Sequence, residues 1–200
     1  MKLTFTSSAL AEIKADMLAL FVPSDEKRWS ETVRRITAQF PEASALLESG
    51  DFKGKNASVA TVYVGGVKSK RLALVGVGET EKITLETVRR AAAAVAKAAS
   101  GNKLKSLALA APAGLPIGDE GFGEAAAEGI MLAAYKFTRY FSDKDRSGNT
   151  IESLTFAASD KKALADVKKG AEYAAVVCAG TLLARELGNT PDNDMYPEKL

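Results

Sequence analysis

The chain has 200 residues, of which 46% are hydrophobic, and its 27 lysines and arginines nearly balance 25 aspartates and glutamates. It has no histidine and one cysteine, Cys178, which excludes a histidine-based catalytic triad, an imidazole metal ligand and an internal disulfide. The net charge of +2 gives no strongly basic surface and argues against nucleic acid as a partner. We therefore expect a globular, cytoplasmic protein with one domain of ordinary size.

The N-terminus resembles a secretory signal peptide only superficially. Glu12, Lys14 and Asp16 interrupt any apolar segment of the necessary length. Residues 104–117 and 173–184 are nearly uncharged, but both stretches are too short to cross a bilayer. The sequence therefore predicts no membrane-spanning segment and no membrane partner.

The first part of the chain carries two strand patterns and one helix pattern. Residues 3–5 alternate apolar and polar side chains, and residues 17–22 form a short apolar run. Pro41 is expected to end or reset the helix that follows them. The helix is predicted from apolar residues at helical spacing, namely Trp29, Val33, Ile36 and Phe40.

The middle of the chain predicts two strands followed by a helix. Residues 58–64 and 72–77 are rich in β-branched and apolar side chains, so we expect two paired or adjacent strands. Thr84 can cap a helix over residues 85–99, and Gly101 is placed to end it.

The last part of the chain predicts two more strands, at residues 107–111 and 154–156, and two helices. The first helix is expected over 124–140, and the second runs from a cap at Ser159 to Gly188. Strands and helices thus mostly alternate along the chain. This order predicts an α/β fold, a mixed central sheet with helices on both faces.

The glycines of GVG at 76–78 follow a predicted strand, where a dinucleotide-binding turn would lie. The third glycine of that motif is missing, because Glu81 stands in its place. A glutamate there would repel a pyrophosphate. We therefore interpret 76–78 as an ordinary tight turn between strand and helix.

The loop over 112–123 brings glycines, Asp119 and Glu120 close to the start of a helix. Backbone N–H groups at a helix start can bind an anion. The two acids already complement the helix dipole, which favours a structural role over a ligand site.

Three further residues or groups of residues are considered as possible sites. Asp143, Asp145 and Asn149 form a loose set of oxygen ligands, but the spacing of a calcium loop is not met, so we expect a solvated loop. Cys178 lies on the apolar face of the last helix and is expected to be a buried, inert thiol. Aromatic residues at a predicted helix end are expected to pack at the edge of the core, namely Tyr135, Tyr140 and Phe141.

The C-terminal segment ARELGNTPDNDMYPEKL, residues 184–200, closely resembles the interdomain linker of the leucine (cytosol) aminopeptidase family. Three other segments are similar to the N-terminal half of that family, at 72–79, 88–99 and 128–142. The positions that match the linker pattern ARxLxNxPxNxxxPxxL include Arg185, Leu187, Asn189, Pro191, Asn193, Pro197 and Leu200.

The resemblance implies an N-terminal α/β sandwich of the macro-domain type over residues 1–188. Residues 189–200 would then be the linker and the start of a catalytic domain. The family enzyme is a cytoplasmic homohexameric exopeptidase, whose two divalent metals, zinc or manganese, are held by carboxylates and a lysine of that catalytic domain. No such motif occurs here, so the resemblance implies no catalytic, cofactor-binding or metal-binding residue in this chain. We therefore expect this chain to be the N-terminal domain of the enzyme, truncated near its linker and inactive by itself.

In the parent enzyme the domain would assist oligomer assembly and control access to the active site. Two alternatives come from other classes of protein. A stand-alone macro-like module would bind an ADP-ribose-like ligand through the loops at 76–79 and 111–123, although their acidic residues argue against a diphosphate. A DNA-binding accessory domain is the other, and the nearly neutral charge argues against it.

Overall fold

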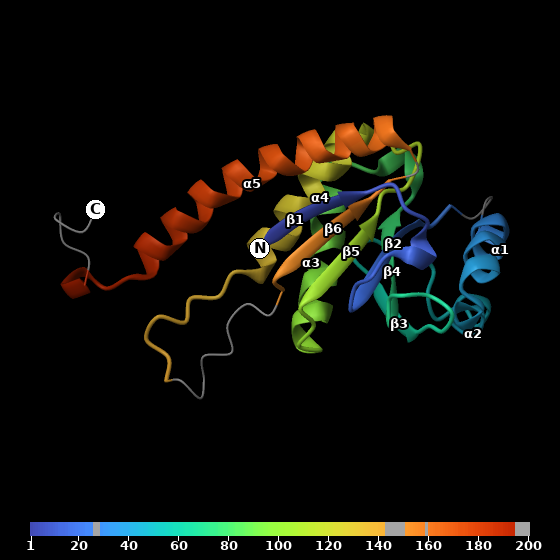
Figure 1. The fold of residues 1–200 in the computed structure, drawn as a ribbon, viewed down its shortest axis with the longest axis horizontal. Coiled ribbons are helices and arrows are strands. Elements are labelled where there is room, and N and C mark those ends of the chain that lie inside the picture. Colours follow the sequence, from blue (N-terminus) through green and yellow to red (C-terminus); the bar gives the residue numbers. More distant parts are fainter. Residues whose placement is uncertain (26–28, 143–150, 159, 195–200) are drawn as a thin grey trace.

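The computed structural model describes residues 1–25, 29–142, 151–158 and 160–194. Within these residues, six strands form one sheet in the order β1-β6-β5-β2-β4-β3 (Figure 1). Only β3 runs antiparallel to its neighbour, so the sheet is mixed, as predicted. The strands are β1 (Lys2–Thr6), β2 (Met17–Pro23), β3 (Val59–Tyr63), β4 (Arg71–Gly78), β5 (Ser106–Ala110) and β6 (Ser153–Ala157).

Helices cover both faces of the sheet because the central strands are apolar on both sides. Alternate residues of β2 belong to two separate cores, with Met17 and Phe21 in one and Leu18 and Val22 in the other. The first core lies under α3 (Leu85–Gly101), α4 (Gly118–Ala134) and α5 (Lys161–Asn189), and α5 contacts β1 and β6. The second core lies under α1 (Trp29–Gln39) and α2 (Ser44–Glu48). The predicted fold class is confirmed.

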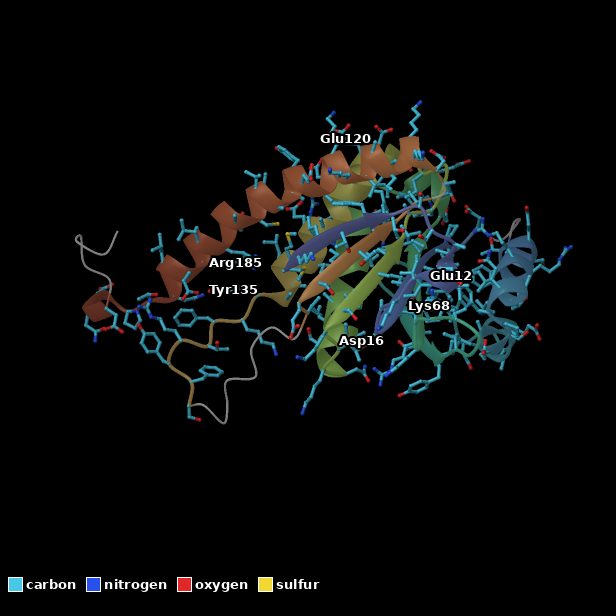
Figure 2. The ribbon with its side chains drawn as sticks, viewed as in Figure 1. Glu12, Asp16, Lys68, Glu120, Tyr135 and Arg185 are labelled. Atoms are coloured by element: carbon cyan, nitrogen blue, oxygen red, sulfur yellow. The ribbon has the colours of Figure 1, made fainter. Side chains whose placement is uncertain are left out.

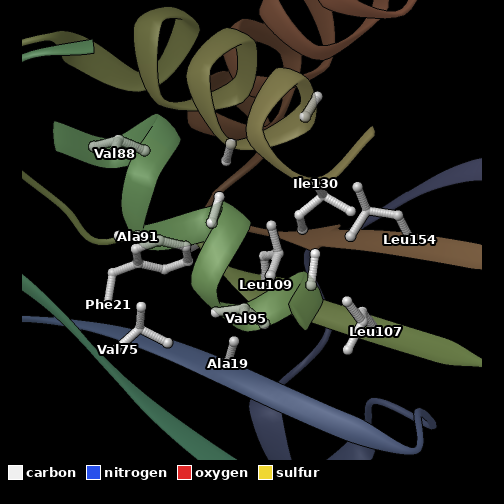
Figure 3. Close-up of a cluster of buried hydrophobic side chains, with 14 of the residues drawn as sticks. Ala19, Phe21, Val75, Val88, Ala91, Val95, Leu107, Leu109, Ile130 and Leu154 are labelled. Carbon is white, nitrogen blue, oxygen red and sulfur yellow. The ribbon is translucent and has the colours of Figure 1, made fainter. Parts of the chain in front are cut away.

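The core beneath α3 and α4 is built from small and medium side chains. Figure 3 shows Ala91 and Val95 of α3 above Ala19 and Val75 of the sheet. Phe21 fills the remaining space and meets Phe122 edge to face, with ring centroids 5.0 Å apart. Alanine on the inner face of α3 lets this helix lie close to the sheet.

Glycines bring α4 into backbone contact with the helices on either side of it. A Cβ atom built on Gly123 would lie 2.1 Å from the carbonyl oxygen of Val167 in α5. A Cβ atom on Gly170 of α5 would lie 2.0 Å from the carbonyl oxygen of Glu120, and one on Gly129 would lie 2.3 Å from that of Arg89 in α3. Real Cβ atoms do not approach so closely, so only glycine fits at these three positions.

Asp16 joins the starts of two parallel strands (Figure 2). Its carboxylate accepts hydrogen bonds of 2.9 Å from the backbone N–H groups of Lys105 and Ser106, and its own N–H donates to the Ser106 hydroxyl. Partial burial opposes ionisation of this carboxyl group, but the hydrogen bonds outweigh it and hold the pKa of Asp16 below its usual value. The carboxylate thus holds the start of β5 beside the start of β2.

Both predicted ends of α3 are observed. Thr84 caps α3, as predicted, through a reciprocal pair of hydrogen bonds with Thr87. Gly101 is the last residue of that helix, as predicted, and Asn102 is the C-cap. The left-handed residue that follows is Lys103, with φ of 55°.

The helix predicted over 124–140 was misplaced by six residues at each end. It begins at Gly118, because the glycines of this segment are helical rather than loop residues, and Gly123 lies at the contact with α5. It ends at Ala134, and Tyr135 is extended with ψ of 132°. No proline or glycine marks this end, so the helical spacing of apolar residues predicted a helix that extends beyond it.

The last helix is confirmed, with different ends. Ser159, the predicted cap, lies outside the described residues. The N-cap is Asp160, whose carboxylate accepts hydrogen bonds of 2.9 Å from the N–H groups of Lys162 and Ala163. Gly188 does not end α5, which continues to Asn189.

We expect Gly123→Ala to destabilise the domain by at least about 2 kcal/mol, because the added methyl group must push α5 away from α4. Gly180→Ala is the matched control, since the same substitution in α5 meets no atom within 4 Å. It should be neutral, or stabilising by up to about 1 kcal/mol, because alanine is the better helix former. Urea unfolding followed by circular dichroism measures both, and equal effects of the two substitutions would contradict the packing account.

Candidate functional site

A cleft of about 970 Å³ lies at the carboxyl ends of β2 and β5. These neighbouring strands stay in register up to the pair Leu20 and Ala110 and then separate. The chain after β2 leads to α1 on one face of the sheet, whereas the chain after β5 leads to α4 on the other. A crevice between strands whose connections diverge in this way is the usual ligand position in an open α/β sheet.

The cleft combines an apolar floor with charged groups from α1. Leu20, Val22 and the segment 110–115 supply apolar surface. Exposed Glu31, Arg34 and Arg35 lie along one wall, and none of them forms an ion pair with another described residue.

Asp25 also lines the cleft but is already engaged. Its carboxylate accepts hydrogen bonds from the backbone N–H of Thr80, at 3.1 Å, and from the Thr80 hydroxyl. This pair links the end of β2 to the turn after β4, where Thr80 begins a 3₁₀ turn.

The 3₁₀ turns of the described chain are Leu10–Glu12, Pro41–Ala43, Thr80–Lys82 and Asp192–Asp194.

The cleft was not found from the sequence. The charged residues of α1 have the pattern of an ordinary solvated helix face, and only the strand order places β2 beside β5. One signal was present: residues 111–115 of the glycine-containing loop do line the cleft. The loop's Asp119 and Glu120 instead lie in the first turn of α4, and Glu120 forms an ion pair with Lys169 of α5 at 2.9 Å.

The glycines at 76–78 do not form a turn, so that interpretation was wrong. Both lie in β4, and the chain around Lys55 crosses directly over Gly76. A Cβ atom on Gly76 would lie 1.9 Å from the Lys55 carbonyl oxygen, while the N–H of Gly78 donates to the Gly54 carbonyl at 2.9 Å. These glycines therefore admit a crossing backbone.

No metal centre is evident in the described part of the chain. Asp143, Asp145 and Asn149, weighed as cation ligands, lie outside it. Within it, no three histidine, cysteine, aspartate or glutamate side chains are grouped so that they could hold a metal ion.

Cys178 is buried on α5, with 1% of its surface exposed, as predicted. Burial raises the pKa of its thiol to about 11, because the uncharged form is favoured away from water. The nucleophilic thiolate is therefore scarce near neutral pH.

Residues of the 184–194 segment anchor the chain that leaves α4 (Figure 2). The guanidinium of Arg185 lies over the ring of Tyr135, 6.0 Å from its centroid, and donates to the Leu132 carbonyl at 3.2 Å. The Tyr135 hydroxyl donates to Glu186 at 3.1 Å and accepts from Asn189 at 3.3 Å. We call these contacts the Tyr135 clamp.

The other aromatic residues of this region follow the helix and lie at the surface. Tyr140 and Phe141 are about half exposed, so the predicted packing at the edge of the core holds better for Tyr135. The hydroxyl of Tyr140 donates to Asp194 at 2.6 Å, and Arg139 donates to the hydroxyl of buried Thr190 at 3.4 Å. Together with the Tyr135 clamp, these bonds join residues 132–141 to the end of α5.

Comparison with known sequences identifies the family. The sequence model described as "Cytosol aminopeptidase family, N-terminal domain" matches residues 18–144, which is more than half of the chain. The chain belongs to this family. The relatives it matches include "Probable cytosol aminopeptidase" of Alkaliphilus oremlandii, 29% identical over 98% of this chain, and of Microcystis aeruginosa, 31% identical over 98%. The chain spans 40% and 39% of the length of these two relatives.

Solved structures share the fold of this cytosol aminopeptidase N-terminal domain. A tomato leucine aminopeptidase mutant superposes with a TM-score of 0.78 at 24% identity, covering 99% of this chain and 40% of that one. The bottromycin maturation enzyme BotP in complex with Mn superposes with a TM-score of 0.64 at 22% identity, covering 92% of this chain and 34% of that one. The described residues of this domain include no helix with the length and hydropathy to span a bilayer.

We expect Cys178 to react with iodoacetamide at pH 8 roughly 100-fold more slowly in the folded chain than in the urea-unfolded chain, since its pKa lies about 2 units above the ordinary 9.0. Because this is the only cysteine, mass spectrometry of the whole chain reports its modification directly. Equal rates in the two states would contradict its burial between α4 and α5.

Proposed function

We propose that this chain acts as the non-catalytic N-terminal domain of a metal-dependent aminopeptidase that removes N-terminal residues from peptides. The observation that carries the proposal is the match of the family's N-terminal domain to 18–144, in a chain that spans only 40% of a relative named for that activity. The boundary proposed within the chain is a domain over 1–188 and a linker over 189–200.

The metal chemistry is assigned to a catalytic domain outside this chain. One solved structural neighbour is described in complex with Mn, which supports a divalent metal in that domain. We propose two such metals, manganese or zinc, as the family resemblance implies. There the metals would polarise the scissile carbonyl and activate water. In the described part of this chain, no group of three or more histidine, cysteine, aspartate or glutamate side chains could hold a metal ion. The proposed contribution of this domain is to restrict access to the active site and to support a cytoplasmic homohexamer, on a macro-type fold.

The outer face of α5 supports a partner of the same polypeptide. Tyr173, Val176 and Leu183 recur at helical spacing along it and are 61%, 75% and 60% exposed. Such a row of large apolar side chains is costly to leave in water. The row continues toward the proposed linker, so the segments that follow the linker are the nearest occupant. We therefore propose that the catalytic domain covers this face.

The chain alone should release no p-nitroaniline from leucine p-nitroanilide above the buffer rate, with Mn²⁺ or Zn²⁺ present. The polypeptide encoded by the complete reading frame should release it in a metal-dependent manner. Chelation with EDTA provides the control for that dependence. Metal-dependent release by the chain alone would contradict the assignment, as would a longer polypeptide that lacks the activity.

A further inference from the structure

The proposed aminopeptidase function assigns no role to the cleft between β2 and β5, yet this cleft has the features of a ligand site. Its volume of about 970 Å³ lies within the range of small-molecule pockets. It lies at the point where the chain leaves neighbouring parallel strands toward opposite faces of the sheet. Backbone and side chains can both reach a ligand at such a point.

The charges that line the cleft are of both signs and close together. Arg34 and Arg35 follow Glu31 by three and four residues on α1, which places the Cβ atom of each arginine about 5–6 Å from that of Glu31. All three side chains are exposed, and none is neutralised by another described residue. The carboxylate of Asp25 is already held by Thr80, so Glu31 is the available anion.

We propose that this cleft binds a small zwitterion, a free α-amino acid or short peptide with an apolar side chain. The ligand carboxylate would pair with the guanidinium groups of Arg34 and Arg35, and its ammonium with Glu31. Guanidinium groups suit a carboxylate because their N–H donors can bind both of its oxygens. The apolar side chain would lie against Leu20 and Val22 on the floor.

The same residues disfavour a nucleotide diphosphate. Glu31 and Asp25 both line the cleft, and their negative charges would repel two phosphate groups. Among the described residues that line the cleft, acid and base are balanced, at two residues of each sign, which suits a ligand without net charge. The balance therefore favours a zwitterion over the ADP-ribose-like ligand considered from the sequence.

The test is a titration of the ¹⁵N-labelled chain followed by amide chemical shifts. The probes are L-leucine, trileucine and two half-ligands: 4-methylpentanoate, which lacks the amine, and isoamylamine, which lacks the carboxylate. At least one zwitterion should shift amides of the β2 end, α1 and residues 110–115 at millimolar concentration. Each half-ligand should bind at least about tenfold more weakly. Comparison of leucine with trileucine shows whether an amino acid or a peptide is preferred.

Substitutions test which charged side chain binds which charged group of the ligand. The double substitution R34Q/R35Q should weaken binding of the better zwitterion by at least about tenfold. E31Q should reduce its affinity to that of the probe without an amine. R90Q is the matched control, because Arg90 is an exposed arginine on α3 paired with Glu86, remote from the cleft, and it should change nothing.

Several outcomes would overturn the proposal. The first is that neither zwitterion shifts any amide signal, and the second is that the half-ligands bind as tightly as the zwitterions. The third is that the R34Q/R35Q variant binds the zwitterion with normal affinity. The fourth is that ADP-ribose binds while the zwitterions do not. An intact spectrum of each variant verifies the fold. Peptidase activity of the longer polypeptide is measured separately, so failure here leaves the proposed function standing, and failure of that function leaves this site standing.

Discussion

Backbone contact between α4 and its two neighbouring helices determines where α5 lies. Gly123 and Gly170 allow α4 and α5 to meet without side chains between them, and Gly129 does the same toward α3. Close contact of this kind brings many atoms within dispersion range over a small area. This contact tolerates no residue other than glycine at the three positions, because any Cβ atom there would overlap a carbonyl oxygen. The three helices therefore form one rigid layer over the sheet.

This packing has a consequence for the far end of α5. The buried residues of that helix fall mainly in its first part, from Val167 to Cys178, where it contacts α4. Beyond Cys178 the helix continues for another eleven residues to Asn189 with most of its surface exposed (Figure 1). The Tyr135 clamp holds this exposed part against Leu132 and Tyr135. The residues that carry the linker resemblance, Arg185 and Asn189, thus have a structural task within this domain.

The sequence predicted the elements well where a local pattern determines them. The strand predicted from the apolar run at 17–22 and the capping threonine of α3 both appear in the structure as expected. Predictions failed where a segment that is distant in the sequence determines the local structure. The glycines of α4 have the pattern of a loop until α5 is placed against them, and Gly76 resembles a turn until the chain at Lys55 crosses it. The cleft was missed for the same reason, because strand order is not a local property.

The central claim is that α5 is held by α4 over its first part and presents its second part to another domain. Hydrogen exchange followed by mass spectrometry tests this directly, on the chain alone and on the polypeptide of the complete reading frame. We expect peptides from 161–174 to be protected in both, because backbone buried in a packed layer opens rarely. Peptides from 175–189 should exchange at least about tenfold more slowly in the longer polypeptide, where a partner covers them. Equal exchange of 175–189 in both would contradict the account.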